Sequence, residues 1–94
     1  MIKIKAYIRL YKKGRKTPFL SGYRPLFNFV AEMRVSGKIK LLDKDEFHPG
    51  DEGVVEISFL NRDYLGDDFE KGKTFTFGES EESLGEGVIS EILQ

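Results

Sequence analysis

The densest group of chemically active side chains in the sequence is a short run of cations, namely Lys12, Lys13, Arg15 and Lys16. Tyr11 precedes this run, and Tyr23 and Arg24 follow it. Clustered cations with nearby aromatic rings suit a nucleic-acid backbone, because ammonium and guanidinium groups pair with phosphates. The alternative is that these lysines discourage aggregation at a strand edge and its loop. The pattern makes RNA binding a hypothesis to carry forward.

The remaining reactive side chains offer little for catalysis. His48 is the only histidine and there is no cysteine, so a histidine triad, a multi-histidine metal site and a thiolate site are all excluded. Acids crowd two stretches, but their spacing matches neither a general acid–base pair nor a calcium loop; they are Asp67, Asp68 and Glu70, then Glu79, Glu81, Glu82 and Glu86. We expect no enzyme activity, no metal and no cofactor.

One stretch nearly matches the phosphate-binding P-loop. Gly66 is followed by Gly72, Lys73 and Thr74, but five residues separate the first glycine from the Gly-Lys-Thr, where the motif has four. Acids between them would repel a triphosphate, and no helix start is predicted there to hold one. The sequence predicts an exposed acidic hairpin loop and no nucleotide binding.

Charge is distributed unevenly between the two halves of the chain. Residues 1–41 contain eleven Lys or Arg and one acid, whereas residues 42–94 contain four Lys or Arg and fifteen acids. Two interpretations stay open. Either the halves fold together and neutralise each other across strand pairs, or each half presents a charged face to a different partner.

Alternation of apolar and polar residues predicts that short strands position these groups. The strictest case is residues 2–10, where Ile2, Ile4, Ala6, Ile8 and Leu10 alternate with polar or aromatic residues. A second run over 27–35 contains Phe27 and Phe29 as expected core residues, and Gly37 predicts a bend before residues 39–41. Further strands are expected at 55–59, 74–77 and 84–93, a basic loop at 12–18, and a turn at 48–51.

Length and composition indicate one domain over residues 1–94. Hydrophobic residues make up 39% of the chain, which is enough for a modest core and too much for a disordered protein. The first residues alternate charged and apolar side chains and do not form a signal peptide, and no apolar run approaches the roughly 20 residues of a membrane span. We expect a cytoplasmic protein that does not enter the membrane.

Residues 14–25, Gly-Arg-Lys-Thr-Pro-Phe-Leu-Ser-Gly-Tyr-Arg-Pro, resemble the start of the C-terminal barrel of bacterial elongation factor Tu. The resemblance continues through Ser36-Gly37, then 49–51, then Leu84-Gly85 and Gly87-Val88, and so covers about residues 3–93. It implies an all-β fold, a six-stranded antiparallel closed barrel of the Greek-key type. Because Met1 directly precedes the first strand, we expect no GTPase domain here.

The resemblance also implies candidate contacts to RNA, with tRNA as the family's example. Arg15 and Lys16 match the family's basic pair, Ser36 keeps a hydroxyl and Glu79 keeps an acid. Leu26 replaces a glutamine, and Glu81 and Glu82 stand in a stretch where the family carries cations. The full set of candidate RNA-binding residues is Lys12, Lys13, Arg15, Lys16, Arg24, Ser36 and Glu79.

Two hypotheses for function follow. The first is a non-catalytic, translation-factor-like barrel that binds structured RNA through its basic loop. The second is a protein-interaction module that docks on a translation factor or an operon-encoded partner and binds no RNA. Fold resemblance cannot choose between them, since function depends on sites carried by the fold.

Overall fold

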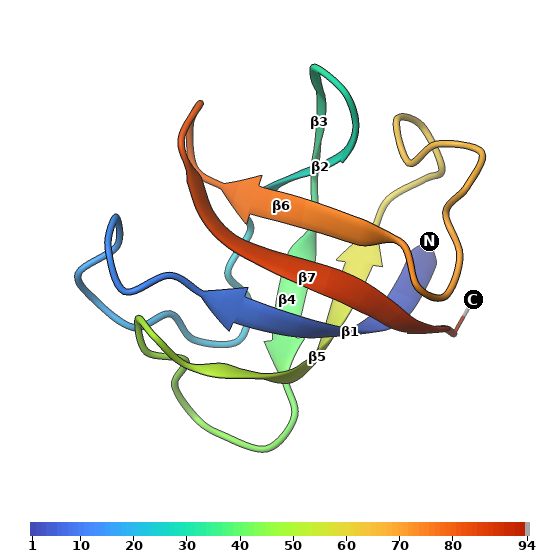
Figure 1. Cartoon of the computed structure of the whole chain (residues 1–94). Helices are drawn as coiled ribbons and strands as arrows, with labels where there is room; N and C mark the ends of the chain where they lie inside the picture. The colour runs from blue at the N-terminus through green and yellow to red at the C-terminus, as the bar shows by residue number, and fades with distance from the viewer. Residues whose placement is uncertain (94) are drawn as a thin grey trace.

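A computed structural model describes residues 1–93 as an all-β protein of seven antiparallel strands, without any helix in that range (Figure 1). The strands are β1 (Ile2–Leu10), β2 (Leu26–Val30), β3 (Met33–Ser36), β4 (Lys38–Leu41), β5 (Glu52–Phe59), β6 (Thr74–Gly78) and β7 (Ser83–Ile92). They form one strongly curled, open sheet in the order β3-β2-β6-β7-β1-β5-β4. The predicted all-β antiparallel class is confirmed.

β1 lies in the middle of the sheet because its alternation suits a strand with one face buried. It pairs with β5 on one side and β7 on the other. Its alternate residues from Ile4 to Leu10 are fully buried, whereas Tyr7 and Arg9 are exposed. The predicted inward face is thus confirmed from Ile4 onward, while Ile2 is only partly buried.

The strand pairs bring the basic and acidic halves of the chain together. Arg9 stands opposite Glu52 on β5 and Glu86 on β7, and Lys5 stands opposite Glu56 and Glu91 in the same two strands. Opposite charges on neighbouring strands stabilise a sheet, and like charges in those places would destabilise it. Within β1, Lys3 also forms an ion pair with Glu56 at 3.8 Å. This register favours the interpretation that the halves neutralise each other across strand pairs.

The segment from residue 27 to 41 departs from the sequence prediction in two ways. A continuous strand over 27–35 is wrong, because Ala31 and Glu32 form a tight turn between β2 and β3, with Glu32 at φ 63°. This turn divides the expected strand into β2 and β3, so the six expected strands become seven. The chain also bends at Gly37, as its position predicted. A side chain there would lie 2.6 Å from the ring of Phe59 and 2.8 Å from that of Phe27.

Two loops complete the scaffold. Residues 48–51 form the expected turn: the Asp51 N–H donates to the His48 carbonyl at 2.9 Å, and Gly50 at φ +93° follows Pro49. Residues 60–73 are not a hairpin, because β5 and β6 are not neighbours in the sheet. They cross from one strand to the other and bury Leu65 and Phe69, while Asp67 and Asp68 are exposed.

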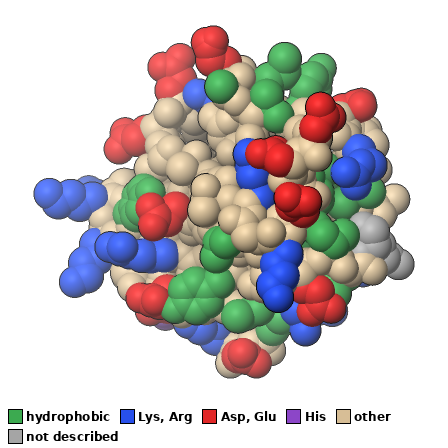
Figure 2. Space-filling view, turned by 45° about the vertical axis from the view of Figure 1, so that its right-hand side comes forward, with side chains coloured by type: hydrophobic (Ala, Val, Ile, Leu, Met, Phe, Trp, Pro, Cys, Tyr) green, Lys and Arg blue, Asp and Glu red, His purple; other side chains and the backbone are tan. Residues whose placement is uncertain are grey.

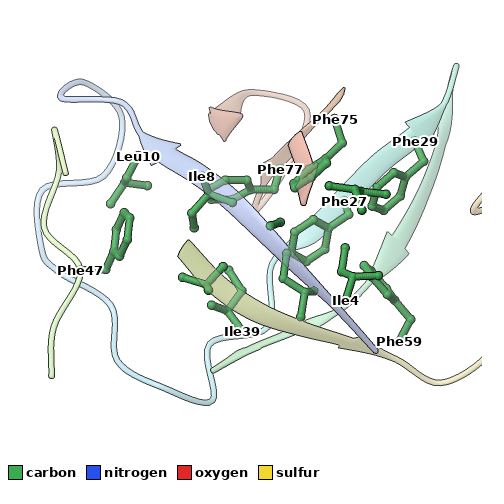
Figure 3. Packing of buried hydrophobic residues seen from close by; sticks show 14 of the residues in the cluster. Ile4, Ile8, Leu10, Phe27, Phe29, Ile39, Phe47, Phe59, Phe75 and Phe77 are labelled. Carbon is green, nitrogen blue, oxygen red and sulfur yellow. The ribbon is translucent and has the colours of Figure 1, made fainter. Parts of the chain in front are cut away.

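Phenylalanine rings fill the space inside the curled sheet (Figure 3). Phe27 is fully buried and contacts four other rings at centroid distances of 5.3–6.2 Å, namely Phe29, Phe59, Phe75 and Phe77. Phe27 and Phe29 are both core residues, as predicted. The core fixes the curvature of the sheet and therefore where its loops emerge.

Candidate nucleic-acid interface

The loop that joins β1 to β2, residues 11–25, carries most of the predicted site and is anchored by its second half. Phe19 pairs through its backbone with Phe47 and stacks on that ring at 5.1 Å. Tyr23 stacks on the other side of Phe19 at 4.6 Å. Beyond it, the Ile39 N–H donates to the Tyr23 carbonyl at 2.9 Å, so the loop runs along the outer edge of β4. The aromatic stack and these backbone hydrogen bonds anchor the second half of the loop.

Arg15 lies at the centre of the loop and is held from three directions. Its Nη1 donates to Glu79 Oε2 at 2.5 Å, and its guanidinium lies 4.8 Å from the centre of the Tyr23 ring. Its Nε also donates to the Thr17 carbonyl at 3.0 Å. The side chain is only 22% exposed. Two predicted site residues, Arg15 and Glu79, are therefore brought together, but they bind each other.

Tyr23 was not predicted as part of this cluster, although it closes it. Its hydroxyl donates to Glu79 Oε2 at 2.7 Å, the same oxygen that accepts from Arg15. Burial, together with the hydrogen bond to the Glu79 carboxylate, raises the pKa of Tyr23 well above its ordinary value of 10.0. The signal available in the sequence was an aromatic residue eight positions after an arginine, which is too common to be diagnostic.

The pKa shift of Tyr23 gives a testable pH dependence. A phenol whose pKa is raised on folding stabilises the fold fully below the unfolded pKa near 10, and this contribution is lost as pH rises through the folded pKa. We expect one tyrosine to ionise later than the others in an alkaline absorbance titration. Tyr23→Phe should remove that late step. If the late step survives in this variant, the proposed cluster is wrong.

Lys12, Lys13 and Lys16 are exposed, and no acidic group of residues 1–93 lies within salt-bridge distance of their ammonium groups. The aliphatic part of Lys12 passes over Gly50, whose missing side chain leaves room for it. Cationic side chains project at the left of Figure 2, on the side where Figure 1 places this loop. The three lysines are thus the cations of the loop that remain available to a ligand.

Acids of the β6–β7 hairpin lie across a cleft from one of these lysines, Lys16. An open cleft of about 390 Å³ lies between the two loops, and Lys16, Glu79, Glu82 and Leu84 are among the residues that line it. Glu82 and its neighbour Glu81 are exposed at the tip of the hairpin. A phosphate that approached through this cleft would meet both Lys16 and the acids. Lys12 and Lys13 do not line the cleft.

The structure separates Arg24 and Ser36 from the rest of the predicted site. They line a small pocket of about 100 Å³ together with Lys38, Ser58, Phe59 and Leu60. Met1 also lines this pocket and precedes β1, whereas Lys12 and Lys13 follow the end of that strand. The seven predicted residues therefore do not form one site: Arg24 and Ser36 line this pocket, and none of the other five does.

A larger hollow lies on the outer face of β1, β6 and β7. It measures about 700 Å³ and is lined by Tyr7, Arg9, Thr74, Thr76 and Val88, among others. The Tyr7 hydroxyl donates a hydrogen bond to Glu52. This hydrogen bond raises the pKa of Tyr7, and so do partial burial of the phenol and the negative charge of Glu52. The Tyr11 hydroxyl donates to Glu86 Oε1 at 2.8 Å. Each of these two carboxylates therefore accepts a hydrogen bond from a tyrosine.

The near-match to a P-loop has a structural role of its own. Lys73 Nζ donates to Asp68 Oδ2 at 2.7 Å, and this hydrogen bond holds the pKa of Asp68 below its ordinary value. Thr74 begins a strand, not a helix. Within residues 1–93, no three His, Asp or Glu side chains form a group that could hold a metal ion, and no helix is long and apolar enough to cross a membrane.

Comparison with known protein families adds no assignment. No protein-family model matches the sequence.

Proposed function

We propose that this chain is a non-catalytic barrel module of the elongation factor Tu C-terminal type that binds structured RNA through Lys12, Lys13 and Lys16. The proposed fold is a closed barrel of six strands. β3 and β4 lie at opposite ends of the sheet order, yet only Gly37 separates them along the chain. Counting residues 33–41 as one bent strand gives six strands and joins the two ends of the sheet.

The observation that carries the RNA part is the contrast between Arg15 and its neighbouring lysines. Arg15 is tied to Glu79, to Tyr23 and to the loop backbone, so it orders the loop without offering its charge to a ligand. The lysines around it are exposed and project from that ordered frame. A preorganised loop loses less conformational entropy on binding, and each free ammonium can replace a counterion on a phosphate.

Salt dependence tests this proposal. Three lysine–phosphate contacts, at about 0.7–0.9 per phosphate, predict a log–log slope of affinity against salt of roughly −2 to −3. The measurement is fluorescence anisotropy with unfractionated tRNA as the probe. Replacing Lys12, Lys13 and Lys16 together with Ala should remove most of the slope. The same three-charge change at Lys5, Lys40 and Lys71 is the matched control and should leave the slope within about one unit of the parent value.

The alternative, a protein-interaction module without RNA binding, is favoured by one observation. Glu79 and Glu82 line the cleft beside the basic loop, which gives this face both charges, as protein partners commonly require. Changing Glu81 and Glu82 to Arg separates the two functions. RNA affinity should rise severalfold if phosphate approaches this hairpin. Unchanged tRNA binding in both the lysine and the glutamate variants would favour the protein partner.

A further inference from the structure

Strand pairing is interrupted between β3 and the segment that follows β5. β4 and β5 pair in register, with Lys38 opposite Ser58. Continued past Gly37, that register would place Ser36 opposite Leu60. No such pair forms, because the chain bends at Gly37 and the two segments separate. The resulting groove measures about 300 Å³ and is lined by residues 34–36 on one side and by Leu60, Asn61, Asp63 and Tyr64 on the other.

The β3 side of the groove has backbone groups available for pairing. β3 ends the sheet, and β2 is its one neighbouring strand within the described residues. The Gly37 N–H donates to the Pro25 carbonyl, and hydrogen-bonded pairs alternate along an antiparallel ladder, so the N–H and C=O of Ser36 point away from β2. An unpaired strand edge of this kind is a template for another extended chain.

The groove is also flanked by exposed apolar side chains. Leu60 is 74% exposed, Tyr64 is 55% exposed, and Met33 at the start of β3 is 45% exposed. Tyr64 has a φ of 67°, which is uncommon for a bulky aromatic residue and costs backbone strain. The ring is therefore held at the surface, where it lines the groove beside the open edge of β3.

Positive charge gathers at one end of the groove. Ser36 and Leu60 line both the groove and the adjoining pocket that contains Arg24, Lys38 and Ser58. No acidic side chain of residues 1–93 lines this pocket, and neither Arg24 nor Lys38 forms an ion pair within that range. Two cations and two hydroxyls beside an apolar floor suit a carboxylate.

We propose that this groove binds an extended, apolar segment of a partner protein that carries an acidic residue at one end. The segment pairs with β3 as an added strand, packs an apolar side chain between Leu60 and Tyr64, and places its carboxylate between Arg24 and Lys38. β3 has four residues, so the paired stretch is about 13 Å long. Strand addition supplies backbone hydrogen bonds, and the apolar and cationic ends supply specificity.

The same surface is a poor match for RNA. A phosphate could occupy the cationic pocket, but a polynucleotide has no groups that continue a β ladder. Leu60 offers no hydrogen bond to a nucleotide. The groove lining carries one acid, Asp63, and one cation, Arg34, and a neutral peptide backbone is compatible with both. This site is distinct from the RNA interface proposed above, because Lys12, Lys13 and Lys16 line neither the groove nor its adjoining pocket.

The test uses a labelled nine-residue peptide of alternating valine and threonine that ends in two aspartates. Titration into the ¹⁵N-labelled full chain should shift amide signals of residues 33–36 and 60–64. Replacing Arg24 and Lys38 together with Ala should weaken binding by about tenfold or more, since two charge-assisted contacts are lost. Leu60→Asp should weaken it to a similar extent. Lys12→Ala with Lys13→Ala, a matched loss of two charges, should leave the peptide affinity unchanged.

A second peptide that ends in two lysines is the charge control and should bind at least tenfold more weakly. A single-stranded oligouridylate is the polyanion control and should leave residues 33–36 unshifted. The proposal is overturned if the aspartate peptide produces no shifts at millimolar concentration, or if its shifts fall outside the groove. It is equally overturned if the oligouridylate binds this groove in preference to the peptide.

Discussion

Phe27→Ala should be among the most destabilising single substitutions in this chain. The ring is fully buried and packs against four others, so its removal leaves a cavity that the surrounding strands cannot close. Such truncations cost about 3–5 kcal/mol. A chain of this length has a free energy of unfolding of roughly 5–14 kcal/mol. At about 4–8 °C per kcal/mol, the melting midpoint should fall by at least about 12 °C.

Thermal unfolding monitored by circular dichroism measures this effect. Phe29→Ala should also lower the melting midpoint. Leu20→Ala is the control, because Leu20 is exposed and belongs to no core cluster. Its midpoint should stay close to that of the parent. Midpoints within error of the parent for both phenylalanine variants would mean that the register of β2 is wrong.

Gly85→Ala should be comparably severe although it adds a single methyl group. Gly85 lies on β7 opposite Phe77 and Leu10. An added Cβ would stand 2.5 Å from the Arg9 carbonyl oxygen, and the Phe77 ring would be closer still. The ring could turn, but the carbonyl belongs to the central strand β1 and cannot move without disturbing the ladder. Overpacking costs about 1–3 kcal/mol where side chains can adjust, and we expect about 3 kcal/mol or more here.

Gly53→Ala is the matched control for this prediction. Gly53 also lies in a strand, β5, but the nearest atoms to an added Cβ are 3.8 Å away, at the end of Lys44. Alanine in a strand interior is less costly in conformational entropy than glycine, so stability should be unchanged or slightly higher. Urea unfolding midpoints compare the two. Equal midpoints for Gly85→Ala and Gly53→Ala would contradict the close packing of β7 on β1.

Patterning in the sequence predicted the sheet because its signal is local. Alternation over β1 is unbroken, and the turn at Pro49 and Gly50 has the residues that its geometry demands. The hairpin at Ala31 and Glu32 was missed because neither residue is typical of a turn, and apolar alternation continues through it. Its left-handed Glu32 is held by the pairing of β2 with β3, which local sequence does not reveal.

The candidate site was harder to predict because its decisive contacts are long-range. Arg15 and Glu79 are 64 residues apart, so no local pattern indicates that one neutralises the other. Likewise, Arg24 is next to Tyr23 in sequence, yet it lines a separate pocket with Ser36 and Lys38. The sequence shows that cations are clustered in this loop. Only the three-dimensional structure shows that Arg15 orders the loop while the lysines remain available to a ligand.

The most direct test of the central claim, RNA binding by the basic loop, is to map the RNA contact on the protein by NMR. Unfractionated tRNA titrated into the ¹⁵N-labelled chain at low salt should shift or broaden amide signals of residues 12–17 first. Residues 33–36 and 60–64 should stay unaffected. Perturbation that is confined to those groove residues, or a spectrum unchanged by tRNA, would contradict the account.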